Sequence, residues 1–146
     1  MAVKPIPDGY HTITPALVTE GADAVLEFLK KVFGATELMV HRHPNGTIWH
    51  CELQIGDSRI MLSEANEQFK AMPAAFSLYV EDVDAAYRRG IEAGGVSLRE
   101  PANQFYGDRT GGVRDPAGNQ WWISTHVEDV ATEELERRMK AAEGSH

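Results

Sequence analysis

Residues 17–38 of the chain, LVTEGADAVLEFLKKVFGATEL, decide its fold because they join a strand to an amphipathic helix. The β-branched run at 12–18 predicts the strand, and the turn formers that follow it predict a helix start. Apolar residues then recur at the spacing of one helical face before Gly34 ends the helix; they are Val25, Phe28, Leu29, Val32 and Phe33.

Strands are expected to follow this helix. Hairpin turns are predicted at 44–46 (Pro-Asn-Gly) and at Gly56-Asp57, with strands over 47–55 and 59–63. The first half of the chain is therefore predicted to be a β-α-β-β-β unit over residues 10–64.

The same order of elements starts again at residue 76. The run 76–80 predicts a strand and Asp82 can cap a helix, whose apolar face consists of Val83, Tyr87 and Ile91. Laid on the first half, this segment matches Val18 with Val80 and Gly56 with Gly118, both 62 residues apart.

We therefore predict a duplicated unit, with a second module over 76–126 and a connector over 65–75. The alternative is that any two strand-helix units align this well. A helix is expected over 130–143, capped by Thr132, and its narrow apolar stripe of Leu135, Met139 and Ala142 suits packing on the outside of the domain or against another subunit.

Composition excludes several classes of protein. The chain has 146 residues, with 14 Lys and Arg against 22 Asp and Glu, and its net charge of −8 disfavours nucleic acid and acidic lipids as partners. No apolar run is long enough for a signal peptide or a membrane span. The single cysteine, Cys51, excludes an intramolecular disulfide, so a cytoplasmic location is expected.

Four segments carry a family resemblance over residues 10–126: GYHTITP (9–15), HCELQIGDSRIML (50–62), FYGDR (105–109) and DPAGNQWW (115–122). Together with the duplication, they resemble the vicinal oxygen chelate superfamily of glyoxalases, bleomycin resistance proteins and extradiol dioxygenases, and within it the PhnB-like glyoxalase subgroup. The resemblance implies an α+β fold in which paired βαβββ modules form incomplete curled barrels, here with a C-terminal helix and as a single domain over 1–146.

The resemblance also implies positions for metal ligands. Through the offset of 62 residues these fall on Ile13, Ile60, Ala75 and Trp122, none of which can bind a metal. No cofactor is therefore predicted, and a divalent metal is the alternative. Its fallback ligands are His11, His50 and Glu52, at a displaced site.

Alternation along 47–55 separates two strand faces, with Trp49, Cys51, Leu53 and Ile55 on one and Ile48, His50, Glu52 and Gln54 on the other. If the first set packs on the helices, His50 and Glu52 line the concave cleft and are candidates for proton transfer. Arg109 is the candidate donor to a developing enolate. The alternatives are that the polar face only meets solvent and that Arg109 forms a salt bridge with Asp108 or another loop carboxylate.

The remaining candidates are substrate-binding residues. Trp122 offers a stacking wall or, alternatively, simply fills the cavity. The other predicted contacts are His11, Tyr79, Phe105, Tyr106 and Asp108, whereas His41, His43 and His126 lack a supporting pattern and receive no role.

These observations lead to three functional hypotheses. The first is a metal-independent isomerase or lyase of glyoxalase type that binds a small organic molecule in a concave cleft. The second is a noncatalytic, drug-sequestering protein of the bleomycin-resistance type, and the third is a metal-dependent glyoxalase or dioxygenase with a displaced site. A homodimer is expected, because members of this superfamily commonly complete their clefts by pairing subunits.

Overall fold

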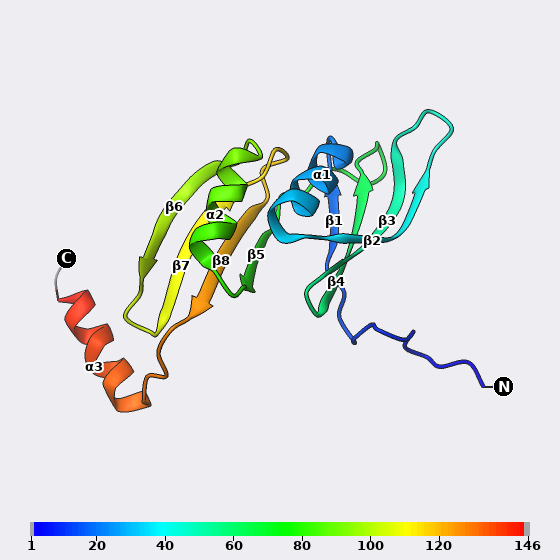
Figure 1. Ribbon diagram of the computed structural model, residues 1–146. Coiled ribbons are helices and arrows are strands. Elements are labelled where there is room, and N and C mark those ends of the chain that lie inside the picture. Colours follow the sequence, from blue (N-terminus) through cyan, green and yellow to red (C-terminus); the bar gives the residue numbers. More distant parts are fainter. Residues whose placement is uncertain (1, 145–146) are drawn as a thin grey trace.

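The computed structural model describes residues 2–144, which form two four-stranded sheets and three helices (Figure 1). In chain order the elements are β1 (Ala16–Thr19), α1 (Ala22–Phe33), β2 (Thr36–Arg42), β3 (Ile48–Ile55), β4 (Ser58–Glu64), β5 (Ala75–Tyr79), α2 (Val83–Glu92), β6 (Val96–Asn103), β7 (Asp108–Arg114), β8 (Gln120–His126) and α3 (Thr132–Glu143).

The two sheets have the same topology. Their strand orders are β1-β4-β3-β2 and β5-β8-β7-β6, and in each sheet the first pair is parallel and the other two are antiparallel. A helix connects the first strand of each sheet to the edge strand on the far side. The predicted pair of βαβββ modules with a C-terminal helix is therefore confirmed.

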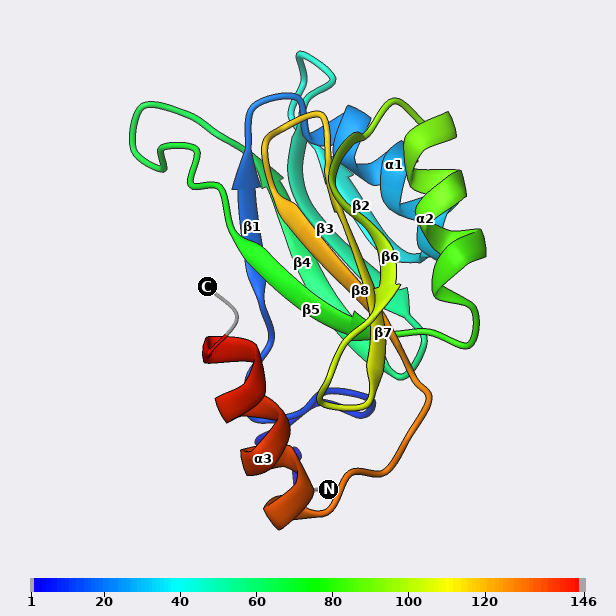
Figure 2. The ribbon, with the colours of Figure 1, turned by 90° about the vertical axis from the view of Figure 1, so that its left-hand side faces the viewer.

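Helices α1 and α2 lie side by side and join the modules into one core (Figure 2). The predicted apolar face of α1 is buried except for Phe33, which is half-buried and lies 5.5 Å from the Trp121 ring of β8. Trp121 also stacks on Phe76 of β5 at 4.6 Å between ring centroids. Gly95 permits close packing here, since a Cβ at this position would lie 2.4 Å from Val113.

Both helix starts are capped by the last strand of their own module. The Glu64 carboxylate accepts the backbone N–H groups of Gly21 and Ala22 at 2.9 and 3.0 Å, and the Thr125 hydroxyl oxygen accepts the N–H of Val83 at 2.9 Å. A carboxylate is favourable at the positive end of the α1 dipole.

The hydrogen-bond pairs correct the spacing of the repeat from 62 to 61 residues in these elements. Leu17 pairs with Leu62 and Leu78 with Ile123, and the two caps have the same spacing. The second β-hairpin has a longer turn, since Ile55 pairs with Ser58 in the first whereas the Asp115 N–H reaches the Asn119 carbonyl in the second.

Helix α3 lies beyond the end of β8, away from α1 and α2 (Figures 1 and 2). It begins at Thr132, but the capping position is Ala131 and no side chain caps it, so the predicted role of Thr132 is wrong. Arg138 ties the helix to the body through the Phe105 carbonyl and the Glu128 carboxylate, both at 2.9 Å. Within residues 2–144, no helix is long and apolar enough to cross a membrane.

Candidate functional site

Strand β3 carries the two residues predicted to transfer protons. Cys51 and Leu53 are fully buried beneath α1, so His50 and Glu52 lie on the opposite face, which no helix of this module covers. His50 Nε2 is 2.8 Å from Glu52 Oε2, with 31% and 16% of the two side chains exposed. Alternation thus brings an imidazole and a carboxylate into contact at a partly sheltered place.

A β-bulge corrects the predicted faces at the start of this strand. Arg42 pairs with Ile48 and His41 with His50, which leaves Trp49 as the extra residue. Ile48 therefore turns into the core, whereas Trp49 is 59% exposed on the open face. The Trp49 ring centroid lies 6.1 Å from that of His41 and 6.2 Å from that of His50, so an indole stands next to the His50–Glu52 pair.

Arg109, the predicted donor to a developing enolate, is engaged by other protein groups. Its Nε and Nη2 lie 2.8 and 2.9 Å from the two carboxylate oxygens of Asp84 on α2, and its Nη1 lies 3.3 Å from Asn103. The guanidinium hydrogen bond lowers the pKa of Asp84. Arg109 therefore joins α2 to the second sheet, through a helix carboxylate rather than the loop carboxylates considered from the sequence.

Trp122 lies on the open face of the second sheet, since its neighbour Trp121 is buried. Its ring lies across Gly112, where an added Cβ would come within 2.6 Å of the indole. The Arg99 guanidinium is 5.5 Å from the ring centroid, and the Trp122 N–H donates to Gln120 at 3.1 Å. The indole is thus already in contact with protein groups, one of them a cation.

Two predicted contact residues meet in a cluster that the sequence did not reveal. The Tyr79 hydroxyl donates to Asp108 Oδ2 at 2.8 Å, while His126 Nδ1 lies 2.8 Å from Asp108 Oδ1 and Nε2 lies 2.7 Å from Asp129. The hydrogen bonds to Asp108 and then Asp129 raise the pKa of His126, and that to Asp108 raises the pKa of Tyr79. No periodic signal marks His126, which reaches Asp108 only because β7 and β8 are neighbours.

Phe105 and Tyr106 lie in the turn between β6 and β7. Their rings meet edge to face at 5.3 Å, and both are somewhat more than one-third exposed. Since the Phe105 carbonyl accepts a hydrogen bond from Arg138, this turn is tied to α3. It forms part of the second module and not of the surface around His50.

A partly open cavity of about 700 Å³ lies where the two modules meet. His11 and Tyr79, which were predicted to bind substrate, line it together with Arg59. The sequence predicted a cleft on the concave face of each sheet and gave no signal for a cavity between them, because its walls come from α1, β4, β5 and β8.

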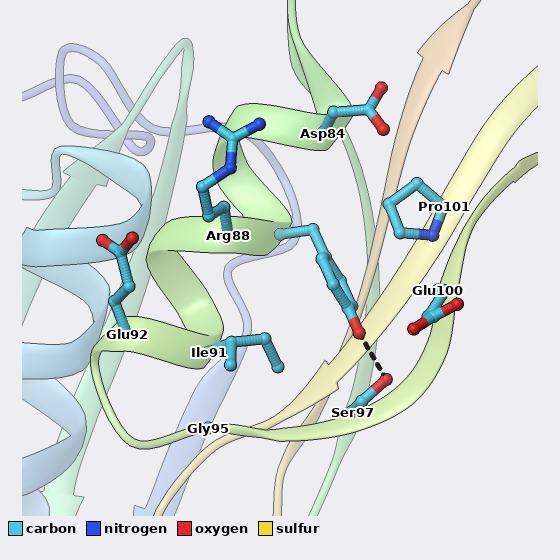
Figure 3. Close-up of a pocket in the computed structure, with 9 residues that line it drawn as sticks. Asp84, Arg88, Ile91, Glu92, Gly95, Ser97, Glu100 and Pro101 are labelled. Atoms are coloured by element: carbon cyan, nitrogen blue, oxygen red, sulfur yellow. Dashed lines mark hydrogen bonds between the residues drawn. The ribbon is translucent and has the colours of Figure 1, made fainter.

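A shallower groove of about 630 Å³ runs between α2 and the edge strand β6 (Figure 3). Tyr87 lines it, and the Tyr87 hydroxyl donates to Ser97 Oγ at 2.6 Å. Arg88, Glu92 and Glu100 surround the groove, and none of the predicted site residues lines it.

The donor set does not fit the metal chemistry that the fold family implies. Ile60, one of the implied ligand positions, is buried in the core. With the corrected spacing of 61 residues, Trp122 corresponds instead to Met61 on the open face of the first sheet, and the Met61 side chain is a thioether. No three His, Cys, Asp or Glu side chains in the described part of the chain are grouped so that they could hold a metal ion, and the fallback set of His11, His50 and Glu52 is therefore not assembled. Cys51 supplies no ready thiolate, since burial raises its pKa to about 11.

Two mycobacterial proteins are similar in sequence. Rv0887c of Mycobacterium tuberculosis and Mb0911c of Mycobacterium bovis, both uncharacterised, are each 31% identical to this chain over 140 residues. The matched region covers 88% of this chain, 82% of Rv0887c and 92% of Mb0911c.

Solved structures share the fold at lower identity. TioX from Micromonospora sp. ML1 has a TM-score of 0.69 at 24% identity and covers 81% of this chain and 100% of its own. A PhnB protein from Bacillus cereus has a TM-score of 0.61 at 19% identity, with coverages of 79% and 99%.

The model of one protein family matches residues 11–123. This range includes nearly all of both modules and of the four sequence segments that carried the resemblance. The chain therefore belongs to the Glyoxalase/Bleomycin resistance protein/Dioxygenase superfamily.

Proposed function

We propose that the protein binds a small organic molecule on the open face of the first sheet and catalyses an isomerase or lyase reaction of glyoxalase type. The observation that carries this proposal is the contact of 2.8 Å between His50 Nε2 and Glu52 Oε2. We also propose that the protein belongs to the PhnB-like subgroup of the superfamily.

The His50–Glu52 pair provides an oriented base. When Nε2–H donates to the carboxylate, the neutral imidazole carries its lone pair on Nδ1. Within residues 2–144, His50 Nδ1 makes no hydrogen bond, so it is available to a ligand. A carbon acid with its acidic C–H next to a carbonyl group matches this base, which would take the proton and return it to a neighbouring atom.

Trp49 supports binding beside this base. Its indole is exposed between His41 and His50 and offers an apolar face against which a planar substrate stacks. Since Arg109 is engaged with Asp84, the proposal assigns it no catalytic role.

The test is proton exchange in deuterated water, followed by NMR across a panel of α-keto acids and hemithioacetals. For a substrate that exchanges, His50→Gln is expected to reduce the rate at least about a hundredfold, as loss of a general base does. His43→Gln is the matched control, because His43 is exposed in the turn before β3. Equal rates for the wild type and His50→Gln would contradict the proposal.

Sequestration of a drug without turnover is the second candidate. The 59% exposure of Trp49 and the net charge of −8 favour it, since a flat cationic compound would stack on the indole and be attracted by the charge. Calorimetry with a bleomycin-type drug tests it. Low-micromolar binding that Trp49→Ala removes and His50→Gln preserves would support sequestration over catalysis.

A homodimer is part of the proposal. The open sheet faces expose Met39, Trp49 and Tyr79, and Met139 of α3 is 43% exposed, so a second copy would shelter apolar surface. Sedimentation equilibrium is expected to give twice the chain mass. A single-chain mass at micromolar concentration would contradict this part.

A further inference from the structure

The cavity between the modules has an apolar floor built from elements of both halves. Phe33, Ile55, Phe76, Leu78 and Trp121 line it, and three of these form the aromatic group in which Trp121 lies 4.6 Å from Phe76 and 5.5 Å from Phe33. Its volume of about 700 Å³ is within the range of small-molecule sites. His50 and Glu52 do not line it.

Arg59 at this cavity has only neutral partners. Its Nε donates to Gln54 Oε1 at 2.8 Å, its Nη1 donates to the Asp8 carbonyl oxygen at 3.2 Å, and its guanidinium lies 4.6 Å from the Tyr10 ring centroid. The side chain is half-buried, and no carboxylate of residues 2–144 forms an ion pair with it. A sheltered cation is stabilised when an anion accompanies it.

The other polar groups around the cavity leave this charge uncompensated. Asp57 is the acidic residue that lines it, and its carboxylate accepts a hydrogen bond from Ser58 at 3.2 Å rather than from Arg59. His11, Ser58 and Tyr79 also line the cavity, and none of them brings a carboxylate to it. The Arg59 guanidinium group thus lacks a carboxylate partner, although the chain has eight more acidic than basic residues.

We propose that this cavity is a binding site, separate from the His50–Glu52 surface, for a monocarboxylic acid with a flat apolar body. The carboxylate would pair with Arg59, and the apolar body would lie against Phe33 and Phe76, which are half-buried and pack on Trp121. The contacts with Asp8 and Tyr10 hold the guanidinium at the cavity before a ligand arrives.

Calorimetry with naphthaleneacetate and naphthaleneacetamide tests the proposal, because the two probes differ in charge and hardly in shape. The acid is expected to bind the wild-type chain at least about tenfold more tightly than the amide. Arg59→Gln is expected to remove this preference, whereas Arg59→Lys retains part of it. Arg114→Gln is the matched control, because Arg114 is exposed on β7 and does not line the cavity.

A second readout places the ligand. The Trp121 ring stacks on Phe76 at the cavity, so its indole N–H signal is expected to shift as the acid binds, and Arg59→Gln is expected to need at least about tenfold more acid for the same shift. Equal affinity for the acid and the amide would overturn the proposal. An equal loss of acid binding in Arg114→Gln would also overturn it, and so would a Trp121 signal that does not move when the acid binds. Circular dichroism verifies that each variant is folded.

Discussion

The carboxylate of Asp115 accepts the indole N–H of Trp121 at 2.9 Å within the turn between β7 and β8. The same carboxylate accepts the backbone N–H groups of Ala117 and Asn119 and the side-chain N–H of Asn119, all between 2.9 and 3.0 Å. Asp115 and Trp121 are 4% and 2% exposed. The DPAGNQWW segment that marks the family thus builds a turn and anchors a core tryptophan, and its acidic residue has no free oxygen for catalysis.

Asp115→Ala is therefore expected to destabilise the fold. The substitution leaves buried N–H donors without an acceptor, which costs about 3 kcal/mol in the free energy of unfolding. Urea denaturation measures this loss. Asp57→Ala in the matching turn of the first module is the control, since among residues 2–144 that exposed carboxylate accepts a side-chain hydrogen bond from Ser58 alone. An equal loss in both variants would contradict the assignment.

His126 is expected to make stability depend on pH. Its pKa is raised in the folded chain by Asp108 and Asp129, so its contribution is complete below the unfolded value of about 6.5 and is lost as the pH rises through the folded value. The difference in unfolding free energy between the wild type and His126→Asn should therefore shrink as the pH is raised above about 6.5. A difference that grows with pH would refute the prediction.

Gly112 is expected to tolerate no side chain while Trp122 is present. A Cβ at this position would lie 2.6 Å from the indole, so Gly112→Ala should cost about 1 to 3 kcal/mol of stability through overpacking. The double variant Gly112→Ala, Trp122→Leu should recover part of that loss. Denaturant titration of the wild type, the two single variants and the double variant measures the coupling energy between the two positions. Strictly additive losses would show that the two residues do not compete for space.

Cys51 is expected to resist thiol reagents in the folded protein. It has no exposed surface, and burial raises its pKa to about 11, so at neutral pH the thiolate is scarce. Ellman's reagent should modify one thiol per chain quickly in urea and slowly in buffer. A fast reaction in buffer would show that β3 opens readily.

Local patterns in the sequence were sufficient to predict the elements that pack against one another. The five apolar positions of α1 and the buried positions Cys51 and Leu53 follow from helical and strand periodicity. Periodicity fails at Trp49, because a bulge depends on hydrogen bonds to β2 that leave no mark on β3 alone. The repeat spacing of 62 was wrong by one residue. One of its two matches aligned hairpin turns that differ in length, and the other aligned Val18 with Val80, whereas the strand pairs match Leu17 with Leu78.

The candidate site was less predictable because its contacts join distant segments. His50 and Glu52 are two residues apart on one strand, so alternation alone places them on one face. The pairing of Arg109 with Asp84 and of His126 with Asp108 depends instead on how a helix crosses the sheet and on strand order. The cavity at Arg59 requires both modules in place, so neither half of the sequence reveals it.

The two caps at the starts of α1 and α2 bear on how the halves are compared. Glu64 and Thr125 share no chemistry beyond an oxygen atom, yet each accepts backbone N–H groups at the first turn of its helix. The two modules share a hydrogen-bond acceptor at the start of the helix, but the residue that provides this acceptor differs between them. Comparing distant relatives by the structural role of each position will therefore detect homology that sequence identity alone misses.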